Sequence, residues 1–381
     1  MSLFGTWMQR TAQAYLIFDL TKSSIYLGYV GFAYGLPSWI FMLYGGAIAD
    51  RFPRRSILLI AQISMMILAF ILAGLTITGL VLPWHIVLLA FLLGCANAFD
   101  APARQAFVIE LVDSSDLTNA IALNSSMINS AMVIGPAVAG LTYAAFGPAW
   151  CFIINGITFI AVIVALLFMK LKAFTPVDKQ VSIMLEIKDG LVFAVKKPII
   201  RTLIINLGVL SLAGLGFVTL LPVWAVEILG GDATTNGYLH TARGIGALSG
   251  ALLIAAIGQL YSKGKLFTVG TIVMPVFLLI FSFTRLLPAS FITLIGVGWG
   301  FMVMVNLSNT IVQMNLTDNL RGRVMGIFTF TFFGLMPIGS LVNGALADLL
   351  GAARTIQINA SILFVAAIML ILFFPFIRDQ K

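Results

Sequence analysis

The chain has 381 residues, of which 60% are hydrophobic and only 9% are charged, and its formal net charge is +8. A soluble protein of this length carries about 25% charged residues, so most of this surface must face lipid. The composition therefore argues against a soluble domain and predicts an all-α membrane protein.

Twelve apolar runs are long enough to cross a bilayer, which takes about 20 residues as a helix. The first six are 1–19, 25–48, 57–78, 85–106, 119–145 and 149–171, and the second six are 202–226, 235–260, 266–285, 289–313, 323–349 and 354–376. The first run begins at residue 1 without a charged flank, from which we expect a truncated first helix.

Basic residues set the expected orientation. If both termini are cytoplasmic, most of the 22 Lys and Arg residues lie inside, and the outer segments keep only Lys22, Arg285 and Arg354. Because cytoplasmic loops carry an excess of Lys and Arg, we expect this orientation in the cell inner (cytoplasmic) membrane. The bias explains the positive net charge without a nucleic-acid partner.

Ionisable residues occur inside the first and eighth spans. Such residues cost several kcal/mol unless they face a cavity or find partners. Gln9 and Gln13 share one face of the first span with Arg10 beside them, and His240 and Arg243 share a face of the eighth. We expect these five to be substrate-cavity residues, with the arginines binding an anionic or strongly polar group. Alternatively, each arginine pairs with a carboxylate such as Asp19 or Glu227 and only holds helices together.

The loop after the second span carries a dense charged motif: Gly46, Asp50, Arg51, Arg54 and Arg55. The glycine allows close helix approach, and the aspartate at the membrane edge invites a guanidinium, such as that of Arg104, or a positive helix N-terminus. The motif resembles the loop signature of major facilitator transporters, with Pro53 in place of its second glycine. The resemblance implies a gating loop, whereas the alternative is that the arginines only determine topology.

Asp100, in the inner part of the fourth span, is the best carboxylate for proton coupling, and His240 is the best imidazole. The alternative for Asp100 is a local pair with Arg104, four residues further on.

The fifth span places small residues at four-residue spacing, with a proline among them: Ala131, Gly135, Pro136, Ala139 and Gly140. Such spacing lets another helix pack against the backbone, and the proline removes one helical hydrogen bond. The pattern resembles a motif of the antiporter branch of the major facilitator superfamily, which implies export. Simple helix packing is the alternative.

Three further segments, 5–24, 101–106 and 321–324, resemble the branch of this superfamily that contains enterobactin and macrolide exporters. One position departs from the wider pattern. Many proton-driven antiporters carry an arginine in the fourth span where this chain has Ala90, so a proton mechanism that uses that arginine is not expected.

The two halves are expected to be repeats. Shifting the sequence by 204 residues places Gly140 on Gly344, Gly147 on Gly351 and Asn155 on Asn359. We therefore predict an N-terminal six-helix bundle over 1–171, a cytoplasmic linker over 172–200 and a C-terminal six-helix bundle over 201–381. In the linker, Ile183, Ile187, Leu191 and Val195 recur every fourth residue, which predicts an amphipathic helix on the inner membrane surface.

These features predict a secondary active transporter with the major facilitator fold, in which the substrate site lies between the halves. We expect proton-coupled efflux of a small amphipathic molecule of the drug, macrolide or siderophore type by a monomer. Uptake of a nutrient by the same fold is the alternative, and a receptor is a remote one. The sequence shows no nucleotide-binding loop, metal-ligand cluster or catalytic triad, so we expect neither an enzyme nor a cofactor.

Overall fold

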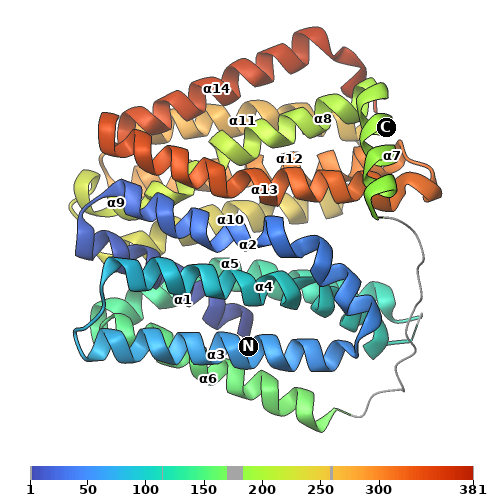
Figure 1. Ribbon diagram of the computed structural model, residues 1–381. Coiled ribbons are helices and arrows are strands. Elements are labelled where there is room, and N and C mark those ends of the chain that lie inside the picture. The colour runs from blue at the N-terminus through green and yellow to red at the C-terminus, as the bar shows by residue number, and fades with distance from the viewer. Residues whose placement is uncertain (1, 114, 170–182, 258–260, 381) are drawn as a thin grey trace. The chain divides into compact units, whose positions relative to one another are not determined.

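The computed structural model describes residues 2–113, 115–169, 183–257 and 261–380 (Figure 1). Its regular secondary structure within these residues is entirely helical. The helices are α1 (Ser2–Thr21), α2 (Ser24–Arg51), α3 (Arg54–Ile77), α4 (Pro83–Leu111), α5 (Leu117–Phe146), α6 (Pro148–Phe168), α7 (Ile183–Lys196), α8 (Pro198–Val209), α9 (Leu221–Val223), α10 (Ala233–Ile257), α11 (Lys263–Phe283), α12 (Leu287–Met314), α13 (Asp318–Leu350) and α14 (Ala352–Phe373).

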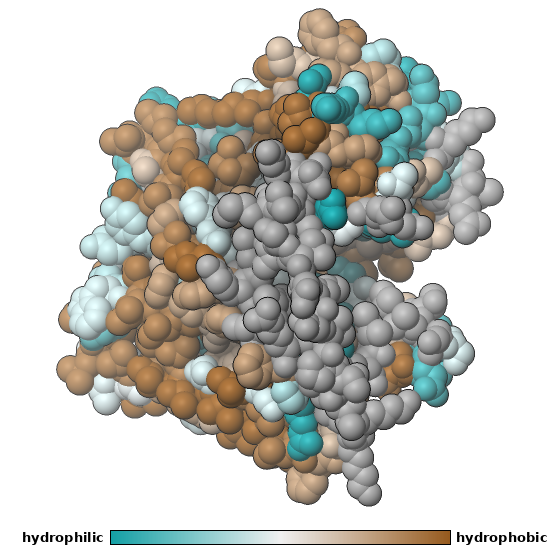
Figure 2. Space-filling model, turned by 45° about the vertical axis from the view of Figure 1, so that its right-hand side comes forward, coloured by the Kyte–Doolittle hydropathy of each residue, from teal (hydrophilic) through white to brown (hydrophobic). Residues whose placement is uncertain are grey.

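Within the described residues, ten helices are long and apolar enough to cross a membrane, if the broken helix Pro198–Ile228 counts as one. These ten coincide with the last ten predicted spans, and α1 and α2 coincide with the first two. Large hydrophobic side chains lie exposed along the helices, among them Ile60, Phe168, Ile292 and Leu372. Figure 2 shows such residues over much of the coloured surface, as expected for a protein that faces lipid.

The chain forms two compact units. The first comprises Met1–Lys179 and Gly231–Thr241, and the second comprises Gln180–Gly230 and Ala242–Lys381. The boundary therefore passes through α10, whose first turns belong with α1–α6.

In the first unit, α3 packs against α4 and α6, α2 against α4, and α1 against α5 and α6. Buried residues of α3, α4 and α6 form its apolar core: Ala61, Met65, Ala69, Leu93 and Phe159. In the second unit, α11 packs against α12 and α14, and α13 packs against α7 and the broken helix.

Glycine makes the same turn in both units. Gly147 joins α5 to α6 with φ 88°, and Gly351 joins α13 to α14 with φ 84°. A side chain is strained in this region of backbone space, so glycine is the residue that fits. The two turns are separated by the shift of 204 residues that the sequence repeat predicts.

The seventh span is broken. After α8 the chain forms a π-helical stretch (Leu210–Gly214), a 3-10 stretch (Gly216–Leu220), α9 and a second π-helical stretch (Trp224–Ile228). Pro222 contributes to the break because it has no backbone N–H to donate. Asn343 of α13 donates to the carbonyl of Leu212 at 3.3 Å, so a side chain from a neighbouring helix satisfies part of the irregular backbone.

The helix α7 lies against α13 in the second unit (Figure 1). Gly190 and Ala194 face the protein, whereas Leu191 and Val195 are exposed, as an amphipathic helix on a membrane surface requires. The side chains of Ile183 and Ile187 lie outside the described residues, and the position of the helix on the membrane stays a prediction.

Candidate functional site

Two glutamines of α1 are bonded inside the first unit. Asn155 of α6 donates to the Oε1 atom of Gln9 at 2.6 Å, and Gln13 donates to the carbonyl of Ile86 on α4 at 3.2 Å. Both glutamines are buried. Their amides therefore tie α1 to α6 and α4, and a direct role with substrate stays a prediction.

Arg10 is half-buried beside them. Its guanidinium carbon lies 4.1 Å from the centre of the Tyr34 ring and 5.6 Å from the centre of the Trp7 ring. A ring face attracts a cation at these distances, but it leaves the N–H donors of the guanidinium unused. Among the described residues Arg10 makes neither a hydrogen bond nor an ion pair.

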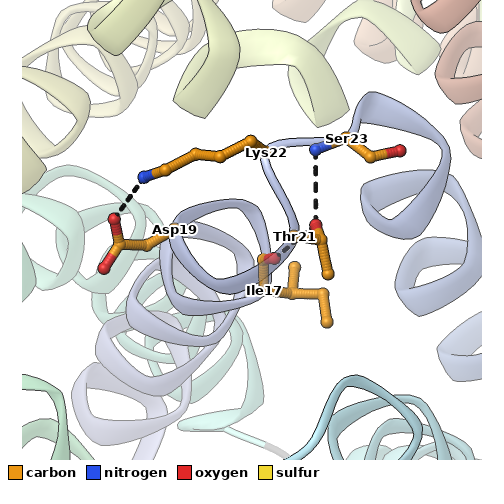
Figure 3. A network of polar contacts seen from close by, with 5 residues as sticks. All are labelled: Ile17, Asp19, Thr21, Lys22 and Ser23. Carbon is orange, nitrogen blue, oxygen red and sulfur yellow. Dashed lines mark hydrogen bonds and ion pairs between the residues drawn. The ribbon is translucent and has the colours of Figure 1, made fainter.

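Asp19 was the alternative partner predicted for Arg10. It pairs instead with Lys22 at 2.6 Å, in the exposed turn between α1 and α2 (Figure 3). In the same turn Thr21 donates to the carbonyl of Ile17, and its Oγ1 accepts from the backbone N–H of Ser23. This carboxylate is therefore engaged at the end of its own helix.

The helix α10 carries His240 and Arg243, both buried. Arg243 makes no hydrogen bond or ion pair with any described residue, and its Nε is fully covered. Sequence analysis missed Asn236, whose amide is buried on the same helix. The four-residue spacing from Asn236 to His240 is the signal that could have found it.

Asp100 of α4 is 0% exposed and forms an ion pair with Arg104. Gln62 of α3 donates to its other carboxylate oxygen at 2.8 Å. The local pair, one of the two predicted alternatives, is thus present. Whether Asp100 also takes part in coupling stays a prediction.

Two arginines of the motif that follows the second span, both at the start of α3, bind backbone carbonyls of α6 and α4 in the first unit. Arg55 donates to the carbonyls of Leu167 and Met169, at 2.6 and 3.4 Å, where α6 ends. Arg54 donates to the carbonyl of Ala106 on α4 at 3.4 Å. Helix ends leave carbonyls without partners, so Arg55 caps the end of α6. The gating role of the motif stays a prediction. The side chains of the other motif members, Gly46, Asp50 and Arg51, lie outside the described residues.

The small residues of α5 face two different helices. A Cβ atom on Gly135 would lie 2.7 Å from Trp7 of α1, and one on Gly140 would lie 2.7 Å from the carbonyl oxygen of Ala233 on α10. Thr241 of α10 also donates to the carbonyl of Val133 at 3.0 Å.

Three further members of the motif, Ala131, Pro136 and Ala139, are buried. The carbonyl of Pro136 would lie 2.6 Å from a Cβ atom on Gly237 of α10. Backbone-to-backbone packing thus joins α5 to α10 inside the first unit.

No group of three His, Cys, Asp or Glu side chains within the described ranges could hold a metal ion. Arg10 and Arg243 are thus cations inside helices, each without an ion pair among the described residues. Ionisable groups in membrane helices are costly unless they find partners.

The fold and these residues define the class: a multi-pass membrane transporter of the major facilitator superfamily. The chain belongs to the transmembrane secretion effector family of that superfamily, whose family model matches residues 1–379. The predicted resemblance to the major facilitator superfamily is therefore confirmed, and the protein is a transporter and not an enzyme.

Three relatives with assigned roles are similar over most of the chain. The staphyloferrin A transporter of Staphylococcus aureus is 26% identical over 379 residues, which cover 99% of this chain and 93% of that protein. The multidrug efflux pump Tap of Mycolicibacterium fortuitum is 25% identical over 363 residues, which cover 92% of this chain and 88% of that protein. The enterobactin exporter EntS of Salmonella choleraesuis is 26% identical over 332 residues, which cover 85% of this chain and 77% of that protein.

Among solved structures, the nucleoside transporter NupG superposes with a TM-score of 0.77 at 14% identity, covering 100% of this chain and 97% of its own. At this identity the match shows the fold alone, and it confirms the predicted fold class.

Proposed function

We propose that this transporter exports a small amphipathic molecule with an anionic or strongly polar group, by alternating access. The observation that carries the proposal is a pair of arginines, Arg10 and Arg243, which lie in membrane helices without a carboxylate partner among the described residues. A cation inside a membrane protein costs several kcal/mol unless it is compensated. A bound anion supplies the compensation in the transport cycle.

Arg10 suits a substrate that is both charged and aromatic or apolar. The rings of Tyr34 and Trp7 fix its guanidinium by their faces, so its planar edge stays available for a bidentate contact with a carboxylate or a similar group. The relatives support this chemistry by their names, which include transporters of the siderophores staphyloferrin A and enterobactin and a multidrug pump.

The proposed direction is outward, in the cell inner membrane with both termini cytoplasmic. The packing of Gly140 against α10 and the efflux roles in the names of relatives support export. The basic residues of the inner loops support the orientation. The alternative is that a transporter of the same fold takes up a nutrient into the cell.

Protons are the proposed coupling ion. We assign the coupling step to Asp100, which is buried in α4, pairs with Arg104 and accepts a hydrogen bond from Gln62 of α3. Proton flux in vesicles that contain Asp100→Asn tests this step, because unchanged substrate-dependent flux would rule Asp100 out. His240 is the second candidate, and His240→Gln is tested in the same assay.

Accumulation of fluorescent drugs and of siderophores in cells tests the function. Cells with the protein should hold less substrate than cells without it, and collapse of the proton gradient should abolish the difference. Arg10→Gln and Arg243→Gln should both raise accumulation toward that of cells without the protein. The matched control is Arg354→Gln, because Arg354 is exposed in the first turn of α14. Full activity in both test variants would contradict the role of the arginines.

A further inference from the structure

An open groove runs between α3 and α4 in the first unit, where the two helices lie side by side (Figure 1). Its volume is about 540 Å³, which falls within the range of roughly 300–1,000 Å³ that small-molecule sites occupy. All of its lining residues come from these two helices. The groove is therefore complete within one unit.

Small side chains create the hollow. They are Ala61 and Ser64 of α3 and Cys95 and Ala96 of α4. Larger side chains border it, and two of them, Ile60 and Ile67, are 67% and 50% exposed. The hydroxyl of Ser64 donates to the carbonyl of Ile60 in its own helix at 2.8 Å. The lining is therefore apolar, and it suits a hydrocarbon better than a polar ligand.

The groove is as long as one leaflet of a membrane is deep. On α3 it extends from Ile57 to Leu68, a separation that corresponds to a rise of about 17 Å in a helix. On α4, Phe99 packs against the cluster that contains Ile57, and Ala96 packs against the cluster that contains Ala61. The lining of α4 thus follows that of α3 in the opposite direction. Half of the hydrocarbon core of a bilayer is about 15 Å, so the groove matches the reach of one lipid chain.

A cation lies at one end of the groove. Arg54, the first residue of α3, precedes Ile57 by three residues, which places both on one side of the helix. The guanidinium of Arg54 donates to the carbonyl of Ala106 on α4 at 3.4 Å, so it reaches across the two helices that form the groove. A guanidinium matches the geometry of a phosphate. The charge at this end therefore complements the head of a phospholipid whose chain lies along the groove.

We propose that the groove binds one acyl chain of an anionic phospholipid, with the lipid phosphate at Arg54. The chain has the length and the apolar character that the groove requires, and lipid surrounds a membrane helix. An empty groove would leave its lining without atoms to contact, and the neighbouring lipid supplies them. A lipid held along its chain and at its phosphate stays with the protein, whereas lipids held by chain contacts alone exchange. This inference does not depend on the substrate or the direction of transport.

Native mass spectrometry of the purified full-length protein tests the inference, with dioleoyl phosphatidylglycerol as the probe. The wild type should retain one lipid per chain after detergent exchange. Ser64→Phe fills the groove with a ring and should lower this retention at least tenfold, and Arg54→Gln should also lower it. The matched control is Gly74→Phe on the same helix, because Gly74 does not line the groove and a Cβ atom there would meet nothing within 4 Å. The control should retain lipid as the wild type does.

Thiol labelling gives a second measurement that needs no substitution. Cys95 lines the groove, whereas Cys151 is 0% exposed, so N-ethylmaleimide should react first at Cys95. Added phosphatidylglycerol should slow this reaction at least fivefold, because the bound chain covers the thiol.

Several results would overturn the inference. Equal lipid retention by Ser64→Phe and Gly74→Phe would place the lipid elsewhere, and full retention by Arg54→Gln would remove the phosphate from that residue. Labelling of Cys95 that a fluorescent drug slows and lipid does not would assign the groove to a transported molecule. Labelling that slows with protein concentration alone would assign it to a second copy of the chain. If Ser64→Phe does not fold, the labelling of the wild type decides in the same way.

Discussion

The contact between α5 and α10 makes a sharp prediction about Gly140. A Cβ atom at this position would lie 2.7 Å from the carbonyl oxygen of Ala233 and 3.0 Å from the Cα atom of Thr234. Both neighbours are backbone atoms, so no flexible side chain can move aside. Ordinary contact begins at 3.4 Å, so Gly140→Ala must push the two helices apart by about 0.7 Å. Overpacking of this kind costs about 1–3 kcal/mol.

The matched control is Gly74→Ala in α3 of the same unit, where a Cβ atom would meet nothing within 4 Å. Because alanine favours a helix over glycine by about 1 kcal/mol, this variant should be slightly more stable than the wild type. Thermal unfolding in detergent gives the two stabilities, and an export assay in cells gives the activity. We expect Gly140→Ala to lose both stability and transport. Equal behaviour of Gly140→Ala and Gly74→Ala would refute the role of the close approach.

Three further predictions concern single contacts. Arg55→Gln removes hydrogen bonds to two carbonyls at the end of α6 and should cost about 1 kcal/mol, measured by thermal unfolding; the same stability as the wild type would contradict it. Asn359→Leu leaves Asn343 without its donor and should lower the free energy of unfolding by about 1–3 kcal/mol in the same measurement, whereas an unchanged unfolding temperature would show that the contact is dispensable. Gly216→Ala places a Cβ atom against the amide of Asn343 and should slow transport, whereas normal transport rates in vesicles would show that this contact is dispensable.

The membrane helices could be predicted from the sequence because each is a run of about 20 apolar residues. The turns at Gly147 and Gly351 could also be predicted, because a glycine follows such a run in both halves. The break in the seventh span could not be predicted in this way. Residues 202–226 are predominantly apolar, and Asn343, which bonds to the irregular backbone, lies 131 positions from Leu212. Hydropathy carries no information about such a contact.

The candidate site was predicted in part. Residue type and spacing were enough to select Arg10, Arg243 and Asp100, because a charge inside a membrane span is conspicuous. Their surroundings depend on contacts between helices, such as the ring of Tyr34 against Arg10 and the amide of Gln62 against Asp100. Asn236 escaped notice because asparagine carries no charge and only its burial without a partner distinguishes it.

The direction of transport in oriented membranes tests the central claim most directly. Purified protein is placed in vesicles of one orientation, and accumulation of a fluorescent drug or a siderophore is followed with a proton gradient imposed. The account predicts accumulation in inside-out vesicles that are acidic inside, and its loss when a protonophore collapses the gradient. Accumulation only in right-side-out vesicles, or in neither kind, would contradict proton-driven export.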